Sequence, residues 1–474
     1  MKISLVDVGS GTTTNLLPLG IGLIGAYLLK YSHFRDNLSV DLNLGISEID
    51  KLGACMGEGD GLVGFSCYVW NVKTAIKFAR KIKEKYPKIK IVLGGYSIPK
   101  DPEKIIEFLD RYPHVDFLIH GEGEKAMTAL VDRIIEAHDA QGVPGISGRN
   151  QRGQVFCCKE RQDRIVDLDD IPSPFLTGLF DKFLQERRHE ISGTVWETNR
   201  GCPFSCVFCD WGDSSVTKVM KYGEERLSQE LAWIGKNRIN YVFNADANFG
   251  IFYERDQKIA TLVAATKKKY GYPQFFTTNW TKNSYTKIID IARPLIAAGV
   301  QGDITLSLQS RNPQTLAAIK RVNLRDDKLM ALKKEYHKQS LPTYSDIIFG
   351  LPEETLSSTR DTLDFLMNFE ELDYFSYYPC SLLVNTKMDS ASYKEQYGII
   401  SRKNKVFMTR KHKAMLDERD EEDEIVIGTK TMPVAEWKEA FLLAYAATFL
   451  YNHRTIYFLL KYLKGSAAVS CLGQ

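Results

Sequence analysis

The sequence predicts an α/β protein in which two regions of alternating strands and helices precede a mostly helical C-terminal region. The first observation is a series of five short apolar runs, separated by helical stretches, within residues 1–145. The second is a series of six strand–helix units within residues 191–390. The chain has 474 residues, 44% hydrophobic and 26% charged, so it is long enough to bury two or three domain cores.

Residues 1–145 have the pattern of a doubly wound parallel sheet. The expected strands are KISLVDVG, LSVDLNLG, GLVGFSCYVW, KIVLGGYS and VDFLIHGEG. An amphipathic helix is expected over residues 72–86 and a buried helix within residues 15–29. Most of these strands end in glycine, which lets a ligand approach the backbone closely. Ligands of such sheets bind outside the carboxyl ends of the strands, so the loops that follow these strands should form a binding surface.

Residues 146–190 lose this alternation and are expected to connect two domains, with a turn at Pro172 and Pro174. A second alternation then predicts a partial (β/α)6 barrel over residues 191–390. Its expected strands are GTVWETN, INYVFNAD, PQFFTTNW, DITLSLQ, TYSDIIFG and YFSYYPC. Barrel enzymes carry out their chemistry at the carboxyl ends of the strands, so the loops after these runs are candidate sites.

Residues 391–474 form the expected helical C-terminal domain. The charged run at residues 410–424 is interpreted as a solvated loop, and residues 437–463 as a long helix or a helical pair packed on the barrel. The net charge is only +3, which gives no broad electrostatic case for nucleic-acid binding. The start of the sequence lacks the pattern of a signal peptide, and the early apolar stretch is too short to span a bilayer. We therefore expect a cytoplasmic protein without a membrane segment.

The strongest chemical signal is the triplet Cys202, Cys206 and Cys209, which directly follows the first expected barrel strand. A structural zinc site usually takes four protein ligands, and the sequence contains no second cysteine pair at short spacing apart from the adjacent residues 157 and 158. A cubane iron–sulfur cluster held by three thiolates leaves one iron open, and an open iron can chelate a small molecule. Arg200 and Asp210 flank this loop and are expected to stabilise it by hydrogen bonds.

The C-x-x-x-C-x-x-C loop, with Phe208 before the last cysteine and an expected barrel around it, resembles the radical S-adenosylmethionine (SAM) superfamily. The resemblance implies a [4Fe–4S] cluster on the three cysteines, with SAM bound at the open iron and cleaved to a 5'-deoxyadenosyl radical. It also implies contacts to SAM, although the usual glycine-glycine-glutamate motif is absent. The SAM-binding candidates that the resemblance implies are Phe208, Asp246, Asn248, Ser307, Gln309 and Gly350.

The sheet domain placed before this barrel resembles the cobalamin-binding group of the superfamily, through GFSCYVWN, LGGYSIP and HGEGE. The cobalamin-binding candidates that this resemblance implies are Tyr68, Trp70, Asn71, Gly94, Gly95, Ser97, Gly121, Glu122 and Gly123. The D-x-H-x-x-G motif that supplies a histidine to cobalt is absent. We therefore expect cobalamin without a histidine ligand, with Trp70 either covering the cobalt or serving as a core or interface residue.

Most characterised members of this group are methyltransferases, so the resemblance implies C-methylation of a natural product, small metabolite or peptide. One SAM would methylate cobalamin, and a second would supply the radical. An external low-potential electron donor of the flavodoxin or ferredoxin type is implied as a partner. A non-methylating cobalamin radical enzyme and a non-catalytic cofactor-binding sensor remain alternatives. A methylthiotransferase would need three more clustered cysteines in the first domain, where Cys55 and Cys67 fall short.

Overall fold

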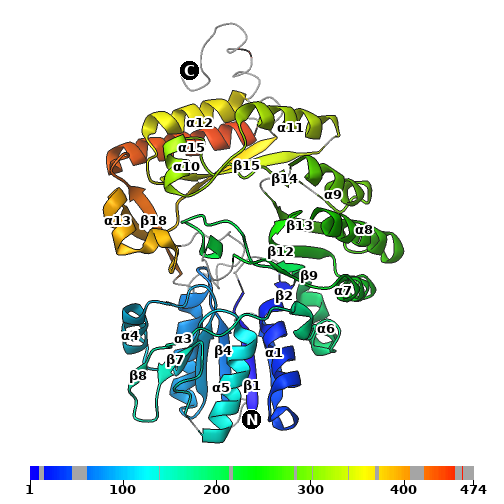
Figure 1. The fold of residues 1–474 in the computed structure, drawn as a ribbon, viewed down its shortest axis with the longest axis vertical. Helices are drawn as coiled ribbons and strands as arrows, with labels where there is room; N and C mark the ends of the chain where they lie inside the picture. The colour runs from blue at the N-terminus through cyan, green and yellow to red at the C-terminus, as the bar shows by residue number, and fades with distance from the viewer. Residues whose placement is uncertain are drawn as a thin grey trace.

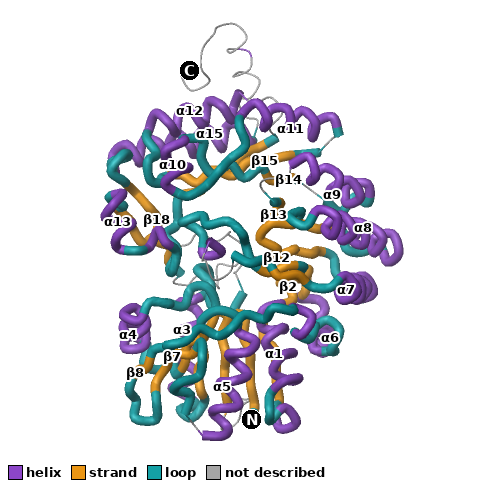
Figure 2. The backbone as a smooth tube through the Cα atoms, viewed as in Figure 1, coloured by secondary structure: helices purple, strands orange, loops and turns teal. Residues whose placement is uncertain are grey.

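A computed structural model describes residues 1–9, 15–44, 61–137, 139–212, 217–281, 285–301, 303–339, 341–368, 373–405, 421–453 and 462. The chain forms two halves that lie one above the other (Figure 1). The N-terminal half is a sheet covered by helices on both faces, and the other half is an arc of strands with helices on its outer side (Figure 2). None of the described helices has the length and apolar character needed to cross a membrane.

The N-terminal sheet has seven strands in the order β3-β1-β4-β5-β6-β7-β8. Its strands are β1 (Lys2–Asp7), β3 (Ser39–Leu44), β4 (Gly61–Ser66), β5 (Lys90–Gly94), β6 (Phe117–Ile119), β7 (Ile146–Arg149) and β8 (Val155–Phe156). The first five pair in parallel, as the alternation predicts. Their carboxyl ends point toward the other half of the chain (Figure 1).

Separate apolar cores lie on the two faces of this sheet. Helices α1 (Leu19–Tyr31) and α5 (Gly123–Ala137) cover one face, and helices α3 (Val72–Lys85) and α4 (Pro102–Arg111) cover the other. Val63 and Ile91 face the second pair of helices, whereas Leu62 and Val92 face the first. Successive strand residues thus point to opposite faces of the sheet. Because both faces are buried, the strands are continuous apolar runs and do not alternate strictly between apolar and polar residues.

Two features of the sequence prediction differ in the structure. Residues after the expected boundary at 145 still belong to the first sheet, because β7 and β8 extend it in antiparallel fashion. Residues ahead of α1 belong to the other half, because β2 (Asn15–Leu17) pairs in parallel with β9 (Ile191–Trp196). The two halves therefore share chain segments instead of following each other as separate units.

The second half contains the six expected strands in two sheets. The strands β12 (Tyr241–Phe249) and β13 (Phe275–Trp280) join β9 and β2 in the order β13-β12-β9-β2. The strands β14 (Ile304–Thr305), β15 (Thr343–Phe349) and β16 (Tyr374–Pro379) form the other sheet, and the parallel bridge Phe276–Gln301 lies between the two. The accompanying helices are α6 (Leu179–Arg187), α7 (Glu224–Lys236), α8 (Tyr253–Tyr270), α9 (Tyr285–Ala297), α10 (Pro313–Ala318), α11 (Asp326–Lys338) and α12 (Leu356–Asn368). A short ladder of β10 (Asn199–Arg200) and β11 (Met220–Lys221) follows the first barrel strand.

The C-terminal region contains the expected helices and, within its described residues, a pair of strands as well. Helices α13 (Ala391–Tyr397) and α15 (Val434–Asn452) flank an antiparallel pair, β17 (Ile400–Lys405) and β18 (Glu422–Gly428). Helix α15 packs on α12 and β16, which confirms the expected helix against the barrel over its described part. Part of the charged run at residues 410–424 lies outside the described residues. Glu421 contradicts a purely solvated loop, because its buried carboxylate accepts the backbone N–H groups of Lys73 (3.0 Å) and Thr74 (2.7 Å).

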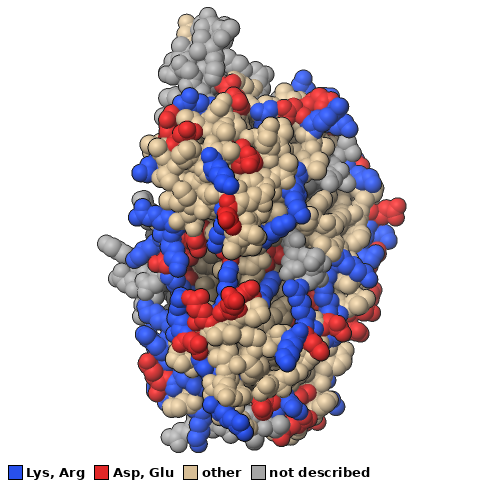
Figure 3. Space-filling view, turned by 60° about the vertical axis from the view of Figure 1, so that its left-hand side comes forward, with Lys and Arg blue, Asp and Glu red and all other residues tan. Residues whose placement is uncertain are grey.

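That carboxylate caps the first turn of α3 from the other half of the chain. Further bonds join the halves around the junction. Asn385 Nδ2 donates to the backbone oxygens of Tyr96 and Ile98, and Asn385 Oδ1 accepts the backbone N–H of Lys100. Ion pairs between lysines of the first half and acids of the second also cross it, and both signs of charge are interspersed on this face (Figure 3).

Candidate active site at the junction of the two halves

The cysteine loop begins directly after β10 and lies at the junction of the two halves (Figure 1). Cys202 and Cys206 are buried, Cys209 is partly exposed, and all three are free thiols. The loop backbone is held on both sides of Val207: its N–H donates to Ile319 O (3.2 Å), and its carbonyl accepts the N–H of Met388 (3.0 Å). The backbone that carries the three thiols is therefore hydrogen-bonded to two other segments of the chain.

The donor set fits a cluster better than a single zinc ion. Among the described residues, no three His, Cys, Asp or Glu side chains converge on one metal ion. A cubane cluster does not require such convergence, because each thiolate binds a different iron. Three thiols in one loop also supply the soft ligands that an iron–sulfur cluster requires. The residues present thus fit a three-thiolate cluster, as the spacing predicts.

Asp246, on β12, holds the segment that leads into the cysteine loop. The carboxylate is fully buried, and each oxygen accepts two hydrogen bonds from Thr198 and Asn199. Burial raises the pKa of Asp246 to about 7, against the opposing effect of these hydrogen bonds. Because Thr198 and Asn199 supply four donors, Asp246 positions the segment ahead of the cysteine loop, and its contact with the ammonium group of SAM stays a prediction.

Asn248 lies two residues further along the same strand and reaches the cysteine loop itself. Its Nδ2 donates to Cys202 Sγ over 3.2 Å, and the residue is 2% exposed. Its Oδ1 is buried without a hydrogen-bond partner. An unpaired buried acceptor beside the cluster ligands is consistent with the predicted contact to SAM, which stays a prediction.

The other SAM candidates lie along the adjacent sheet. Gln309 adopts a left-handed conformation (φ 63°), and its backbone bonds to Asp346 O and to the N–H of Ile348. Ser307 accepts a hydrogen bond at its carbonyl from Arg321 and is partly exposed. Phe208 packs at the edge of the small apolar core that contains Val207. These placements leave the proposed SAM contacts as predictions.

Gly350 ends β15 and starts the turn that the sequence predicts near the adenine. Its φ of 84° favours glycine, and a Cβ there would lie 2.8 Å from Trp437 Nε1. The N–H of Gly350 donates to Glu354 Oε2 (3.0 Å), which ties the turn to a fully buried carboxyl group. Burial raises the pKa of Glu354 to about 8, so this group is protonated at neutral pH. Gly350 shapes the turn, as expected.

The cobalamin candidates lie at the carboxyl edge of the N-terminal sheet, where the resemblance places them. Tyr68 and Trp70 stack with ring centroids 4.7 Å apart and planes 6° from parallel, and both are partly exposed. Asn71 is buried, and its Oδ1 accepts the N–H of Tyr68 (2.7 Å), which closes the loop that carries the two rings. Because the rings are stacked one over the other, a macrocycle would lie against the outer face of one ring of the pair.

The structure favours glycine at the candidate positions for different reasons. A Cβ on Gly95 (φ 114°) would lie 2.5 Å from Cys67 O, and a Cβ on Gly123 would lie 2.6 Å from the side chain of Ile24. Gly121 also has a positive φ but faces open space. Gly94 accepts the N–H of Cys67, and Ser97 donates its own N–H to Cys67 O. These contacts explain the tight loop after β5 without a ligand, so cobalamin contacts here remain predictions.

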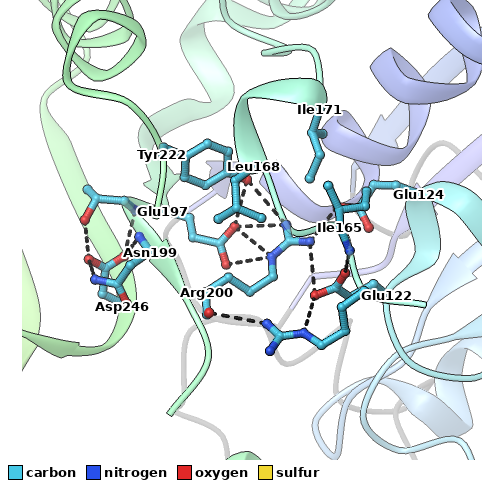
Figure 4. Close-up of polar contacts among 12 residues, drawn as sticks. Glu122, Glu124, Ile165, Leu168, Ile171, Glu197, Asn199, Arg200, Tyr222 and Asp246 are labelled. Atoms are coloured by element: carbon cyan, nitrogen blue, oxygen red, sulfur yellow. Dashed lines mark hydrogen bonds and ion pairs between the residues drawn. The ribbon is translucent and has the colours of Figure 1, made fainter. Parts of the chain in front are cut away.

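Glu122 takes part in an ionic cluster that crosses the junction (Figure 4). Its carboxylate accepts Arg164 Nε (3.1 Å) and the N–H of Ile165 (3.1 Å). Arg200, two residues before Cys202, places Nη1 3.0 Å from Glu124 Oε1 and Nη2 3.0 Å from Glu197 Oε2. The neighbouring carboxylates raise the pKa of Arg200 well above its usual value despite its burial. Arg200 therefore stabilises the loop, as expected, through ion pairs as well as hydrogen bonds.

Aromatic side chains from both halves also meet at the junction. Trp211 Nε1, just after the cysteine loop, donates to Tyr96 Oη (2.9 Å), and the Tyr96 ring lies 6.1 Å from that of Tyr68. Lys100 Nζ lies 3.1 Å from Asp210 Oδ1, so Asp210 also fastens the loop. The structure thus brings the predicted cluster loop and the predicted corrin-facing rings to one junction.

Sequence reasoning missed several residues that build this site. Arg164 and Thr198 have no motif around them, and Glu124 ends the HGEGE loop without being singled out there; only their tertiary partners reveal the role of these residues. Asp346 had a signal, because it opens the D-x-x-x-G-L-P-x-x-T turn. Its Oδ1 is buried without a hydrogen-bond partner, and burial raises the pKa of Asp346 to about 6. It adjoins Gln309 and is a further candidate for a SAM contact.

Comparisons with known proteins agree with this geometry. The family model for the radical SAM superfamily matches residues 196–366, and that for the B12 binding domain matches residues 13–131. The cobalamin-dependent radical SAM methyltransferase TokK of Streptomyces tokunonensis is 34% identical over 86% of this chain and 59% of that protein. A 2-(S-pantetheinyl)-carbapenam-3-carboxylate methyltransferase of Streptantibioticus cattleyicolor is 31% identical over 88% of this chain and 61% of that protein. The chain thus spans about three fifths of the length of these relatives.

Solved structures share the fold. The methyltransferase TsrM of Kitasatospora setae, with cobalamin and a [4Fe–4S] cluster bound, superposes with a TM-score of 0.65 at 15% identity, over 94% of this chain and 90% of that one. The cobalamin-dependent SAM radical enzyme OxsB gives 0.59 at 18% identity, over 83% of this chain and 54% of that one. At these identities the likeness concerns the fold alone.

Proposed function

This chain belongs to the radical SAM superfamily and carries a B12-binding domain ahead of its radical SAM domain, and from that premise we propose that it is a C-methyltransferase. The two domains imply a [4Fe–4S] cluster, SAM and cobalamin as cofactors. The proposed reaction uses one SAM as the methyl source and cleaves a second SAM to a 5'-deoxyadenosyl radical. The relatives named methyltransferases, at 31% and 34% identity, support methyl transfer.

The observation that carries the proposal is the shared junction of the two candidate cofactor sites. Arg200 immediately precedes the cysteine loop and pairs with Glu124 in the first turn of α5, one residue after the predicted corrin-edge residues Gly121 to Gly123. Trp211, on the other side of the cysteine loop, bonds to Tyr96 beside the stacked rings. A protein that only stored the two cofactors would not need to bring their loops together.

The cofactors supply the methyl transfer and the electron for SAM cleavage when they are bound. The residues of this chain supply positions and exclusion of solvent. Cys202, Cys206 and Cys209 would ligate three irons, and the fixed backbone at Val207 keeps that loop in place. The ring of Trp70, stacked on Tyr68, would cover the corrin, where an apolar surface keeps water away from the metal.

The three histidines described in the first half each have a partner within the protein. His114 bonds to the backbone oxygen of Ile76, and His120 bonds to Ser147 Oγ over 2.8 Å. His33 is exposed beside Asp132 and Glu136. We propose that cobalamin binds here with its own base detached and without a protein histidine, as the missing D-x-H-x-x-G motif predicts.

A small natural-product metabolite is the proposed substrate class. The relative named for a carbapenam carboxylate supports a small molecule more directly than a peptide. The proposed partner is an external low-potential donor of the flavodoxin or ferredoxin type, in the cytoplasm.

The proposal is tested by loading the full chain with iron, sulfide and cobalamin without oxygen, and adding SAM, a low-potential reductant and candidate substrates. S-adenosylhomocysteine that requires cobalamin, together with 5'-deoxyadenosine and a methylated product, is expected. Formation of 5'-deoxyadenosine alone would favour a non-methylating radical enzyme. Absence of both products with every candidate substrate, in protein that holds both cofactors, would favour a cofactor-binding sensor.

A further inference from the structure

The side chain of Asn248 makes a specific contact with a cluster ligand. Its Nδ2 lies 3.2 Å from Cys202 Sγ, and the residue is 2% exposed, so water does not compete for this bond. Cys202 is also buried, at 7% exposure. The contact joins the β12 strand directly to the first residue of the cysteine triplet.

The chemistry of the pair fixes the orientation of the amide. A thiolate that binds iron has no proton and can only accept hydrogen bonds. Rotating the amide by half a turn would place Oδ1 against Sγ, where two acceptors repel each other. The orientation with Nδ2 at Sγ therefore suits the thiolate, and it leaves Oδ1, which has no partner in the described structure, as the acceptor for the predicted SAM contact.

Both ends of this contact are held in place. Asp246, two residues before Asn248, accepts four hydrogen bonds from Thr198 and Asn199, which lie just ahead of Cys202. Arg255 donates to the same Thr198 from α8. The strand and the loop are therefore fastened to each other next to the contact, so the amide meets the sulfur in a preorganised geometry.

We infer that Asn248 sets the reduction potential of the cluster through a hydrogen bond to the Cys202 thiolate. Hydrogen bonds to cluster sulfurs are among the factors that set the potential of such clusters. When the [4Fe–4S] cluster gains one electron from an external low-potential donor, its negative charge grows on the sulfurs as well as on the irons. A donor at Sγ stabilises the reduced form more than the oxidised form, and so it raises the potential. The inference rests on the proposed cluster site and adds a redox role to Asn248.

The test is a redox titration of the full chain loaded with iron and sulfide, followed by electron paramagnetic resonance of the reduced cluster. Asn248→Leu removes the donor with a bulkier side chain of the same branching, and Asn248→Ala removes it without any risk of overpacking. We expect a lower midpoint potential in both variants, by an amount on the order of a tenfold change in the reduction equilibrium, which is about 59 mV for one electron. Iron content should match that of the wild-type chain.

Asn244→Leu is the matched control. Asn244 is fully buried on the same strand, but its Oδ1 accepts Thr278 Oγ1, and within the described residues it forms no hydrogen bond with a cysteine. The potential of this variant should equal that of the wild-type chain. An unchanged potential in Asn248→Ala at full iron content, or an equal shift in Asn244→Leu, would overturn the inference while the cluster assignment stands. Failure of the wild-type chain to take up iron would overturn the proposed function instead.

Discussion

Arg200 Nη1 and Glu124 Oε1 lie 3.0 Å apart and connect the segment before the cysteine loop to the helix that begins at the carboxyl edge of the N-terminal sheet (Figure 4). The two side chains are 16% and 5% exposed, so the pair is largely desolvated. Such a pair fixes the relative position of the two segments but adds little net stability, because desolvation offsets much of the Coulombic attraction. Its position means that the two candidate cofactor sites cannot shift independently.

Substituting Arg200 should lower the free energy of unfolding more than substituting Glu124. Arg200→Gln leaves Glu122, Glu124 and Glu197 with only Arg164 as a guanidinium partner, and we expect a loss of about 3 kcal/mol in the free energy of unfolding. Glu124→Gln leaves Arg200 still paired with Glu197, so the loss should be about 1 kcal/mol. Urea unfolding of the two variants measures the difference. Equal losses would show that Arg200 does not hold the two acids together.

Asp346 should contribute to SAM affinity. Its unpaired buried Oδ1 needs a donor, and the hydroxyls of a ribose are suitable donors. Asp346→Asn keeps the shape but removes an acceptor, and we expect roughly tenfold weaker SAM binding, equivalent to about 1.4 kcal/mol. Equilibrium binding of SAM to the cluster-loaded chain checks this, with Asp361→Asn on α12 as the control. Unchanged affinity in Asp346→Asn would remove the residue from the site.

Glu354 should make the folded state less stable as the pH rises. Its folded pKa is raised to about 8 by burial, whereas the unfolded chain releases this proton near 4.5. The folded state thus binds more protons between these values, and its stability falls across that window by on the order of 1 kcal/mol per pH unit. Glu354→Gln removes the titration and should flatten this slope in thermal unfolding between pH 5 and pH 8. The same slope in the variant would mean that another group causes it.

His120 should make the folded state less stable as the pH falls, which is the opposite of the effect of Glu354. It is also not expected to bind cobalt. Burial lowers its pKa from 6.5 to about 4, so the unfolded chain binds the extra proton as the pH falls through this window. Stability should therefore fall from pH 6.5 toward pH 4, and His120→Gln should reduce that fall. The second measurement is the electron paramagnetic resonance spectrum of cob(II)alamin bound to the chain at pH 7. It should show no splitting from a histidine nitrogen in the wild-type chain or in His120→Gln. A splitting that disappears in the variant would identify His120 as a ligand.

Much of the fold follows from local sequence signals. The apolar runs of the first half are strands covered on both faces, and six strand–helix units are a partial barrel, because both patterns depend on neighbouring residues. The cysteine spacing likewise indicates the cluster loop. The pairing of β2 with β9 and the cap that Glu421 places on α3 depend on residues far apart in the sequence, so no local pattern indicates them.

The site shows the same division. The aromatic loop at Tyr68 to Trp70 and the turn at Gly350 carry their own motifs and follow the strands β4 and β15, and the ligand contacts assigned to them stay predictions. Asp246 is expected at the SAM ammonium because a carboxylate suits a cation, and the structure adds its bonds to Thr198 and Asn199, which lie 48 and 47 residues earlier in the sequence. Only the folded chain shows which polar group is already satisfied by the protein and which is left for a ligand.

The central claim is that the two cofactor sites cooperate in methyl transfer. The most direct test is mass-spectrometric measurement of S-adenosylhomocysteine formed from SAM by the cluster-loaded chain, under reducing conditions without oxygen, in the presence and absence of cobalamin. The account predicts that S-adenosylhomocysteine accumulates only when cobalamin is bound. Equal amounts with and without cobalamin, or none in a chain that holds both cofactors and still forms 5'-deoxyadenosine, would contradict it.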